Sequence, residues 1–237
     1  MGNFAHFTVV HRMAMQNVQE ELKEALRRAC NELADGYMVP DIVPTTASFV
    51  FLLESPHVQE LKYGAPVSGS SGASMSRHLF GEAYGHLPLG IIVKKNRDEQ
   101  LHRPSLDKVG LMNVCNIPMQ GSAYGNPDVV RKYADLLRAL ETLRTAGQST
   151  SYKDPALALT QDILLENLRK RLRKLWDRSL FLVPCGRFAQ KFFALADLVS
   201  PQWQVVTGIP HPSYNNWSKP QYAGAVSRLV SLFQNES

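Results

Sequence analysis

Short apolar segments alternate with helix-like patterns along this chain, and that alternation constrains its fold more than any other feature. The apolar segments occupy residues 47–53, 109–115, 179–185 and 203–209. Helical spacing of apolar residues occurs over 16–34, from Asn126 to Leu143, and over 156–178, 187–199 and 221–233. Buried strands that alternate with helices pair in parallel. We therefore predict one α/β domain over residues 1–237, with a central four-stranded, mostly parallel sheet and helices on both faces.

The charge and the cysteine content narrow the class of protein. A formal net charge of +5 favours a polyanionic partner such as nucleic acid. No run approaches the roughly 18 apolar residues of a membrane span, and residues 1–13 lack the layout of a signal peptide. Cys30, Cys115 and Cys185 lie far apart and form no C-x-x-C pair, so we expect no metal and no iron–sulfur cluster. These features predict a cytoplasmic protein that needs no cofactor and does not enter a membrane.

Polar side chains follow the predicted strands at the point where each strand ends. Glu54 comes directly after the first strand, Asn113 lies at the end of the second, and His211 follows the fourth. Ligands of parallel sheets bind at the carboxyl ends of the strands. We therefore expect a carboxylate, a carboxamide and an imidazole to converge at one edge of the sheet. Such a site can activate water, recognise a ligand with an amide edge and stabilise an anion.

Residues 54–72, ESPHVQELKYGAPVSGSSG, resemble the first motif of the uracil-DNA glycosylase superfamily. The bacterial and archaeal branch with a GEAPG motif is the most similar. The aligned positions are Glu54, Pro56, Glu60, Gly64, Pro66, Gly69 and Gly72. Asn113-Val114, the segment 186–189 and His211-Pro212-Ser213 resemble further motifs of this family. The resemblance covers roughly residues 45–120 and 180–235, whereas 73–105 and 145–178 look like insertions or divergent segments.

Several positions depart from the family pattern. Leu53 replaces the first glycine of the motif, and Ser55 stands where the best-known uracil glycosylases have a catalytic Asp. His57 replaces a Tyr that excludes thymine, and Val67 replaces a Phe that stacks on the flipped base. The cysteines that bind an iron–sulfur cluster in the most similar branch are missing. The chain therefore resembles a divergent member of the family without the cluster.

The resemblance implies a role for each matching residue. Glu54 and His211 would be catalytic, with Glu54 orienting water and His211 donating to the leaving base. Base recognition would fall to Asn113, His57, Ser55 and Pro56. DNA contacts would come from Ser68, Ser70, Ser71, Ser213 and the loop Tyr214, Asn215, Asn216 and Trp217, which would fill the space left by the flipped base. The basic run at 169–178 is either a solvated helix face or a further DNA contact.

The implied function is removal of uracil from single- or double-stranded DNA by a monomeric, metal-independent glycosylase of base excision repair. The enzyme would leave an abasic site, and in a bacterium it would associate with the nucleoid. Two alternatives stay open. The chain could act on another lesion, such as hypoxanthine or mismatched thymine, which the departures at Ser55 and Val67 favour. It could also be a relative that binds DNA and holds a base without cleaving it.

Overall fold

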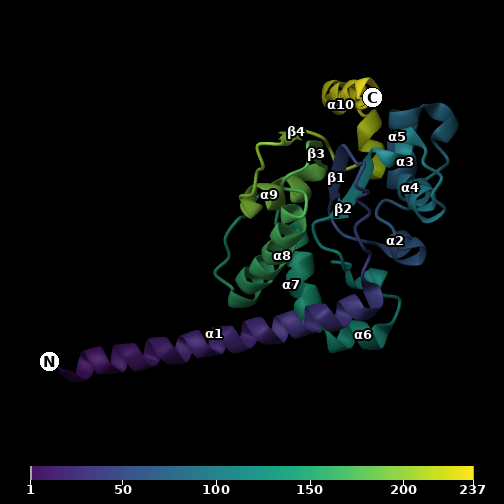
Figure 1. The fold of residues 1–237 in the computed structure, drawn as a ribbon. Coiled ribbons are helices and arrows are strands. Elements are labelled where there is room, and N and C mark those ends of the chain that lie inside the picture. The colour runs from purple at the N-terminus through teal and green to yellow at the C-terminus, as the bar shows by residue number, and fades with distance from the viewer. Residues whose placement is uncertain (1, 237) are drawn as a thin grey trace.

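The computed structural model describes residues 2–236, with side chains from residue 16 onward, and contains a four-stranded sheet (Figure 1). The strands are β1 (Phe49–Leu53), β2 (Val109–Asn113), β3 (Leu180–Pro184) and β4 (Trp203–Val205). They lie in the order β2-β1-β3-β4, and each neighbouring pair is parallel. The predicted fold class is confirmed. An isolated antiparallel bridge joins Ile42 to Leu111 beside the sheet.

Helices cover both faces of the sheet. One face packs against α1 (Gly2–Tyr37), α7 (Ala134–Thr145), α8 (Pro155–Arg173) and α9 (Gly186–Ala196). The other packs against α3 (Ser70–Phe80), α4 (Leu89–Asp98), α5 (Pro104–Asp107) and α10 (Ala223–Asn235). Shorter helices are α2 (Val58–Tyr63) and α6 (Pro127–Lys132), with 3-10 turns at Glu82–Tyr84, Gly121–Ala123, Ser213–Ser218 and Pro220–Tyr222.

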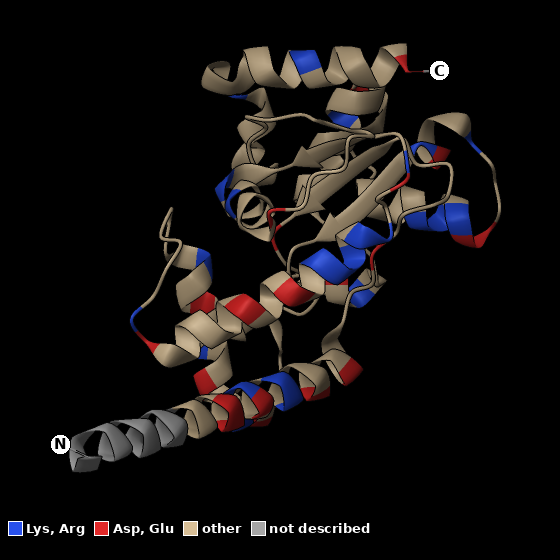
Figure 2. Cartoon of the chain, turned by 60° about the vertical axis from the view of Figure 1, so that its left-hand side comes forward, with Lys and Arg blue, Asp and Glu red and all other residues tan. Residues whose placement is uncertain are grey.

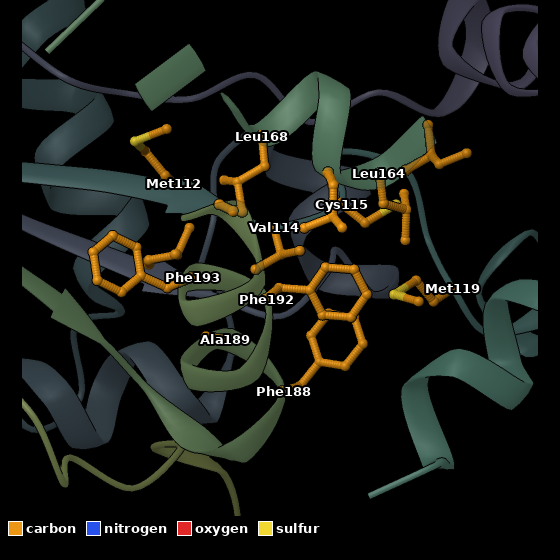
Figure 3. Packing of buried hydrophobic residues seen from close by; sticks show 14 of the residues in the cluster. Met112, Val114, Cys115, Met119, Leu164, Leu168, Phe188, Ala189, Phe192 and Phe193 are labelled. Atoms are coloured by element: carbon orange, nitrogen blue, oxygen red, sulfur yellow. The ribbon is translucent and has the colours of Figure 1, made fainter. Parts of the chain in front are cut away.

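Alternation along each strand divides the core into two clusters. Val50 and Leu52 of β1 face the cluster under α7, α8 and α9, whereas Phe49, Phe51 and Leu53 face the one under α3 and α10. In the first cluster, Phe188 and Phe192 of α9 stack with ring centroids 4.4 Å apart. Figure 3 shows these rings beside Val114, with Leu164 and Leu168 of α8 above them. Successive side chains of a strand point to opposite faces, so this pattern explains why every residue of β1 is buried.

The segments 73–105 and 145–178, which we expected to be insertions or divergent parts, are built into these cores. Met75 and Leu89 from the first segment, and Leu168 and Leu172 from the second, are all fully buried. Both segments therefore contribute to the stability of the domain.

Some element boundaries differ from the prediction. The helical pattern from Asn126 to Leu143 forms two helices, because Tyr133 leaves helical geometry (φ −109°, ψ 23°) between α6 and α7. Strand β4 ends at Val205 rather than at residue 209, and Gly208 then takes a left-handed φ of +79°.

Helix α1 extends well beyond the predicted 16–34 and projects from the body of the domain (Figure 1). Acidic and basic residues are mixed along its described part (Figure 2). In the described part of the chain, no helix is apolar over a stretch long enough to cross a bilayer.

Candidate active site

A cleft of about 1040 Å³ lies at the carboxyl ends of the strands. It brings together the three groups that the sequence placed at strand ends, Glu54, Asn113 and His211. The other lining residues are Leu53, Ser55, His57, Gln59, Glu60, Val67, Gly69, Ser70, Ser71, Ala73, Ser74, Arg77, Gly85, Gln120, Arg144, Pro212, Ser213, Tyr214 and Asn215. The predicted convergence at one sheet edge is therefore present.

Glu54 is fixed by the pairing of β1 with β2, which continues past the ends of both strands. The N–H of Val114 donates to the carbonyl of Leu53 over 2.9 Å, and the N–H of Cys115 donates to the carbonyl of Glu54 over 3.1 Å. The Glu54 carboxylate is half-buried, and its Oε1 lies 3.5 Å from Nη1 of Arg144. Burial raises the pKa of Glu54, and the Arg144 charge opposes that rise. The cleft thus holds a carboxylate whose charge depends on its surroundings.

Glu60 has a structural part in the loop that follows Glu54. Its Oε2 accepts from the N–H of His57 over 2.8 Å, and its Oε1 accepts from the N–H of Val67 over 3.1 Å. Val67 has a φ of +50°, which is unusual for a β-branched residue. A side chain at Gly72 would approach the Val67 carbonyl to 1.7 Å, so the loop lies directly against α3. One carboxylate and one glycine therefore hold the loop in an otherwise unfavourable conformation.

Asn113 presents a buried polar group that lacks a protein partner. The residue is 1 % exposed, and its Nδ2 makes no hydrogen bond. Its backbone carbonyl accepts from Nη1 of Arg171 over 2.7 Å, which fixes the end of β2. Leaving a buried donor unpaired costs roughly 1–3 kcal/mol. A ligand acceptor in the cleft would recover this free energy.

His211 is held as a neutral donor. The N–H of Ser213 donates to Nδ1 over 3.2 Å, and the Ser213 hydroxyl lies 2.8 Å from the same nitrogen. Because Nδ1 accepts from a backbone N–H, the ring hydrogen must reside on Nε2. Burial lowers the pKa of His211 to about 4. At neutral pH the side chain therefore offers Nε2–H, and not a positive charge, to whatever occupies the cleft.

The remaining predicted base-binding residues have different positions. Ser55 and the exposed His57 line the cleft. Pro56 is buried and is absent from the cleft wall. Its position fits a part in turning the chain after β1 rather than contact with a base.

Two of the predicted DNA contacts need correction. Ser68 is 2 % exposed, and its hydroxyl donates to the carbonyl of Ala65 over 2.8 Å. Trp217 is 1 % exposed, and its indole N–H donates to the carbonyl of Pro210 over 2.9 Å. Both side chains are packed into the domain and have their donors satisfied. Unlike the equally buried Asn113, neither lines the cleft, so neither is placed to meet a DNA phosphate or a base there.

The other predicted DNA contacts lie at the mouth of the cleft. Ser70 and Ser71 begin α3, and Ser213 supports His211 as described. Tyr214 is 88 % exposed and, like Asn215, has a left-handed backbone with φ near +50°. Asn216 turns inward, where its Nδ2 donates to the carbonyl of His211 over 3.1 Å. The loop therefore projects a Tyr and an Asn, while Asn216 and Trp217 anchor its base.

The structure also adds cleft residues that sequence reasoning missed. Arg144 comes from the last turn of α7, and Ser74 and Arg77 come from α3. The hydroxyl of Ser74 and the Nε of Arg144 are buried without a hydrogen-bond partner, whereas the Nε of Arg77 lies 3.4 Å from Oε2 of Glu82. These residues lie within helical segments, and nothing in the local sequence marks them as cleft residues. Only the packing of α7 and α3 brings them to the edge of the sheet.

The basic run at 169–178 serves the fold through three of its members. Arg169 donates to the carbonyls of Leu195 and Ala196, Arg171 pairs with Asp41 at 3.0 Å, and Arg178 donates to carbonyls of the segment 44–47. None of the run lines the cleft. The exposed members are Lys170, Arg173 and Lys174, at the end of α8.

The part of the chain that the structure describes contains no cluster of side chains suited to bind a metal ion. No three or more His, Cys, Asp or Glu side chains gather there in a way that could hold a metal ion. Cys30, Cys115 and Cys185 are all free thiols, and burial raises the pKa of Cys115 to about 11. A thiol that stays protonated at neutral pH is a poor metal ligand and a poor nucleophile.

No protein-family model and no curated protein matches this chain. Parallel α/β sheets with a site at the strand ends support many unrelated reactions, so the fold alone does not select a function. The chemistry of the cleft must be deduced from its own residues.

Proposed function

We propose that this protein is a DNA glycosylase that hydrolyses the N-glycosidic bond of uracil in DNA. The observation that carries this proposal is the unpartnered Nδ2 of Asn113, buried in the same cleft as the Glu54 carboxylate and the neutral His211 donor. A carboxamide can donate to O4 of uracil and accept from its N3–H at once. Cytosine carries a donor in place of O4, so it would leave the Asn113 donor facing another donor.

The reaction divides between Glu54 and His211. As the C1′–N1 bond breaks, the electron pair leaves with the base, and the sugar takes on the positive charge of an oxocarbenium-like ion. Glu54 stabilises that charge and accepts a proton from the water that attacks C1′. His211 donates Nε2–H to O2 of the departing uracil anion, and one such preorganised donor is worth about 3–4 kcal/mol. Glu54 then releases the proton that it took from water, and the uracil anion takes up one proton, so the products are free uracil and an abasic site.

The base must leave the helix to reach these groups. Flipping costs a few kcal/mol, and least in single strands and mismatches. The exposed Tyr214 and Asn215 stand at the cleft mouth, where they could enter the vacated space. Ser70 and Ser71 line the cleft at the start of α3, where backbone N–H groups and hydroxyls suit a DNA phosphate. Arg77, in the last turn of α3, adds a guanidinium donor to the same cleft. Such an enzyme would act as a monomer in the cytoplasm, and at the nucleoid in a bacterium.

A second candidate substrate is hypoxanthine. Val67 stands on the cleft wall at the position where the family that this chain resembles has a large aromatic ring, and the smaller side chain favours a larger base. A purine with a keto group at its six-membered ring presents the same kind of acceptor to Asn113. A mismatched thymine offers the same carbonyls with an added methyl group.

Cleavage of oligonucleotides tests the proposal. Uracil is placed once in a single strand, opposite guanine and opposite adenine, and abasic sites are revealed with alkali. We expect cleavage by the wild type and large losses in Glu54→Gln and His211→Ala. Glu141→Gln, on an exposed carboxylate of α7, is the matched control and should keep full activity.

The outcomes separate the alternatives. Cleavage of hypoxanthine or thymine mismatches in place of uracil would reassign the substrate. Binding without cleavage of any lesion would indicate a non-catalytic relative. DNA binding should weaken with salt with a log–log slope near −0.7 to −0.9 per phosphate contacted, and a flat curve would exclude DNA as the partner.

A further inference from the structure

Arg144 is the cation that faces Glu54 across the cleft. It is the next-to-last residue of α7, and its Nη1 lies 3.5 Å from Oε1 of Glu54. Both side chains are about one-quarter exposed, at 25 % and 24 %. Water therefore screens this pair less than it screens a pair on the open surface.

The end of α7 is anchored firmly enough to hold this guanidinium in place. Leu140 and Leu143 are fully buried under the sheet. Nζ of the buried Lys191, from α9, lies 3.5 Å from the carbonyl of Leu143, next to Arg144. A positive charge at the C-terminus of a helix is also favourable for its dipole. Arg144 therefore reaches Glu54 from a rigid element rather than from a loop.

Arg77 of α3 also lines the cleft, but it pairs with Glu82 at 3.4 Å. Three other titratable groups near Glu54 do not supply positive charge. Glu60 of α2 repels it, Cys115 beyond β2 is a protonated thiol, and His211 across the cleft is neutral. Burial favours the protonated form of Glu54, and the charge of Arg144 and its contact with the carboxylate oppose this effect. A protonated Glu54 could neither accept a proton from water nor stabilise a positively charged sugar.

The contact between Arg144 and Glu54 leaves hydrogen-bonding groups of both side chains unused. Arg144 touches one carboxylate oxygen at 3.5 Å rather than forming a bidentate pair, so the second oxygen of Glu54 is available to water. The Nε of Arg144 is buried and has no hydrogen-bond partner. Arginine stays charged at all accessible pH values.

We propose that Arg144 is a positioning residue that keeps Glu54 ionised at neutral pH and directs its carboxylate into the cleft. The catalytic consequence rests on the proposed function, but the effect on the charge of Glu54 does not. Arg144→Gln removes the charge while keeping a side chain of similar length, and Arg144→Lys keeps the charge. Arg138→Gln is the matched control, because Arg138 lies on the same helix, is exposed and pairs with the exposed Asp135 at 3.5 Å.

The first test is a carbon-13 NMR titration of the glutamate carboxyl groups, with the Glu54 signal assigned by its loss in Glu54→Gln. We expect the Glu54 midpoint to move to higher pH in Arg144→Gln, to stay near the wild-type position in Arg144→Lys, and to be unchanged in Arg138→Gln. An unmoved midpoint in a folded Arg144→Gln protein would overturn the proposal. If Arg144→Gln does not fold, Arg144→Met and the Arg144→Lys comparison decide the same question.

The second test is the pH dependence of cleavage. We expect the acidic limb of kcat/KM to move to higher pH in Arg144→Gln, so that the loss relative to wild type is large in acid and shrinks toward alkaline pH. A purely structural role would lower the rate by the same factor at every pH. A shifted NMR midpoint in a protein that cleaves no lesion would sink the glycosylase proposal and leave the role of Arg144 intact.

Discussion

Gly186 lies directly against His211. Gly186 has a left-handed φ of +88°, and a Cβ built on it would lie 2.7 Å from Cβ of His211 and 3.2 Å from its backbone. The N–H of Gly186 also donates to the carbonyl of Ile209 over 2.9 Å. The start of α9 and the segment after β4 can therefore approach closely only because residue 186 has no side chain.

Gly186→Ala should displace His211. We expect a large loss in the rate of uracil cleavage and a small loss in the free energy of unfolding. The left-handed φ adds strain of about 1–3 kcal/mol to either effect. Gly208→Ala is the matched control, because Gly208 also has a left-handed φ (+79°) but has nothing within 4 Å of a new Cβ. Cleavage rates and denaturant midpoints of both variants separate displacement from strain. Equal losses of activity in the two would show that backbone strain alone is responsible.

Asn113→Ala should abolish discrimination between uracil and cytosine with little loss of stability. The substitution removes a buried donor that has no partner, so no hydrogen bond of Nδ2 is lost. Asn96→Ala is the comparison. Asn96 is also buried, but its Nδ2 donates to Asp107 over 2.7 Å and its Oδ1 accepts from Arg103 over 3.0 Å. We expect Asn96→Ala to lose about 1–3 kcal/mol of unfolding free energy and to keep its specificity.

Measurements of uracil and cytosine cleavage, together with urea unfolding of both variants, check this contrast. Destabilisation of Asn113→Ala by as much as Asn96→Ala would mean that the Asn113 amide has a partner within the protein, and it would remove the main support for a ligand at that position.

The sheet and the strand-end groups could be predicted because they depend on local pattern. Apolar runs such as 47–53 have few alternatives to buried strands, and parallel pairing sends Glu54 and Asn113 to one edge. The predicted DNA contacts of Trp217 and Ser68 were wrong, because a loop sequence does not reveal which of its side chains turn inward. Arg144 was missed for the opposite reason, since nothing along α7 distinguishes it from the exposed Arg138. Residues that act through packing between distant helices leave no local signal.

Arg171 should prove structural despite its place in the basic run of α8. Its Nη1 contacts both carboxylate oxygens of Asp41 at 3.0 Å, and its two Nη atoms donate to the carbonyls of Asn113 and Val114. Arg171→Gln should therefore lower the unfolding free energy by about 2–3 kcal/mol, as expected when charged hydrogen bonds are lost. Arg173→Gln, on an exposed neighbour, should change it by about 0.5 kcal/mol or less.

DNA affinity gives the second readout for this pair. A weaker, less salt-dependent binding curve for Arg173→Gln would place DNA along α8. Unchanged curves, with the loss of stability confined to Arg171→Gln, would confine the DNA contacts to the cleft and its mouth.

His211 should make the stability of the protein depend on pH in a specific window. Burial lowers its pKa from 6.5 to about 4 in the folded state. Between these values the unfolded chain binds the proton and the folded chain does not, so stability falls as the pH falls from 6.5 toward 4. His211→Asn has no such group, and its unfolding free energy should vary less over the same window. Chemical denaturation at several pH values measures the two slopes. Identical slopes would mean that His211 is charged in the folded protein, and a charged ring could not hold Nδ1 as an acceptor for the N–H of Ser213.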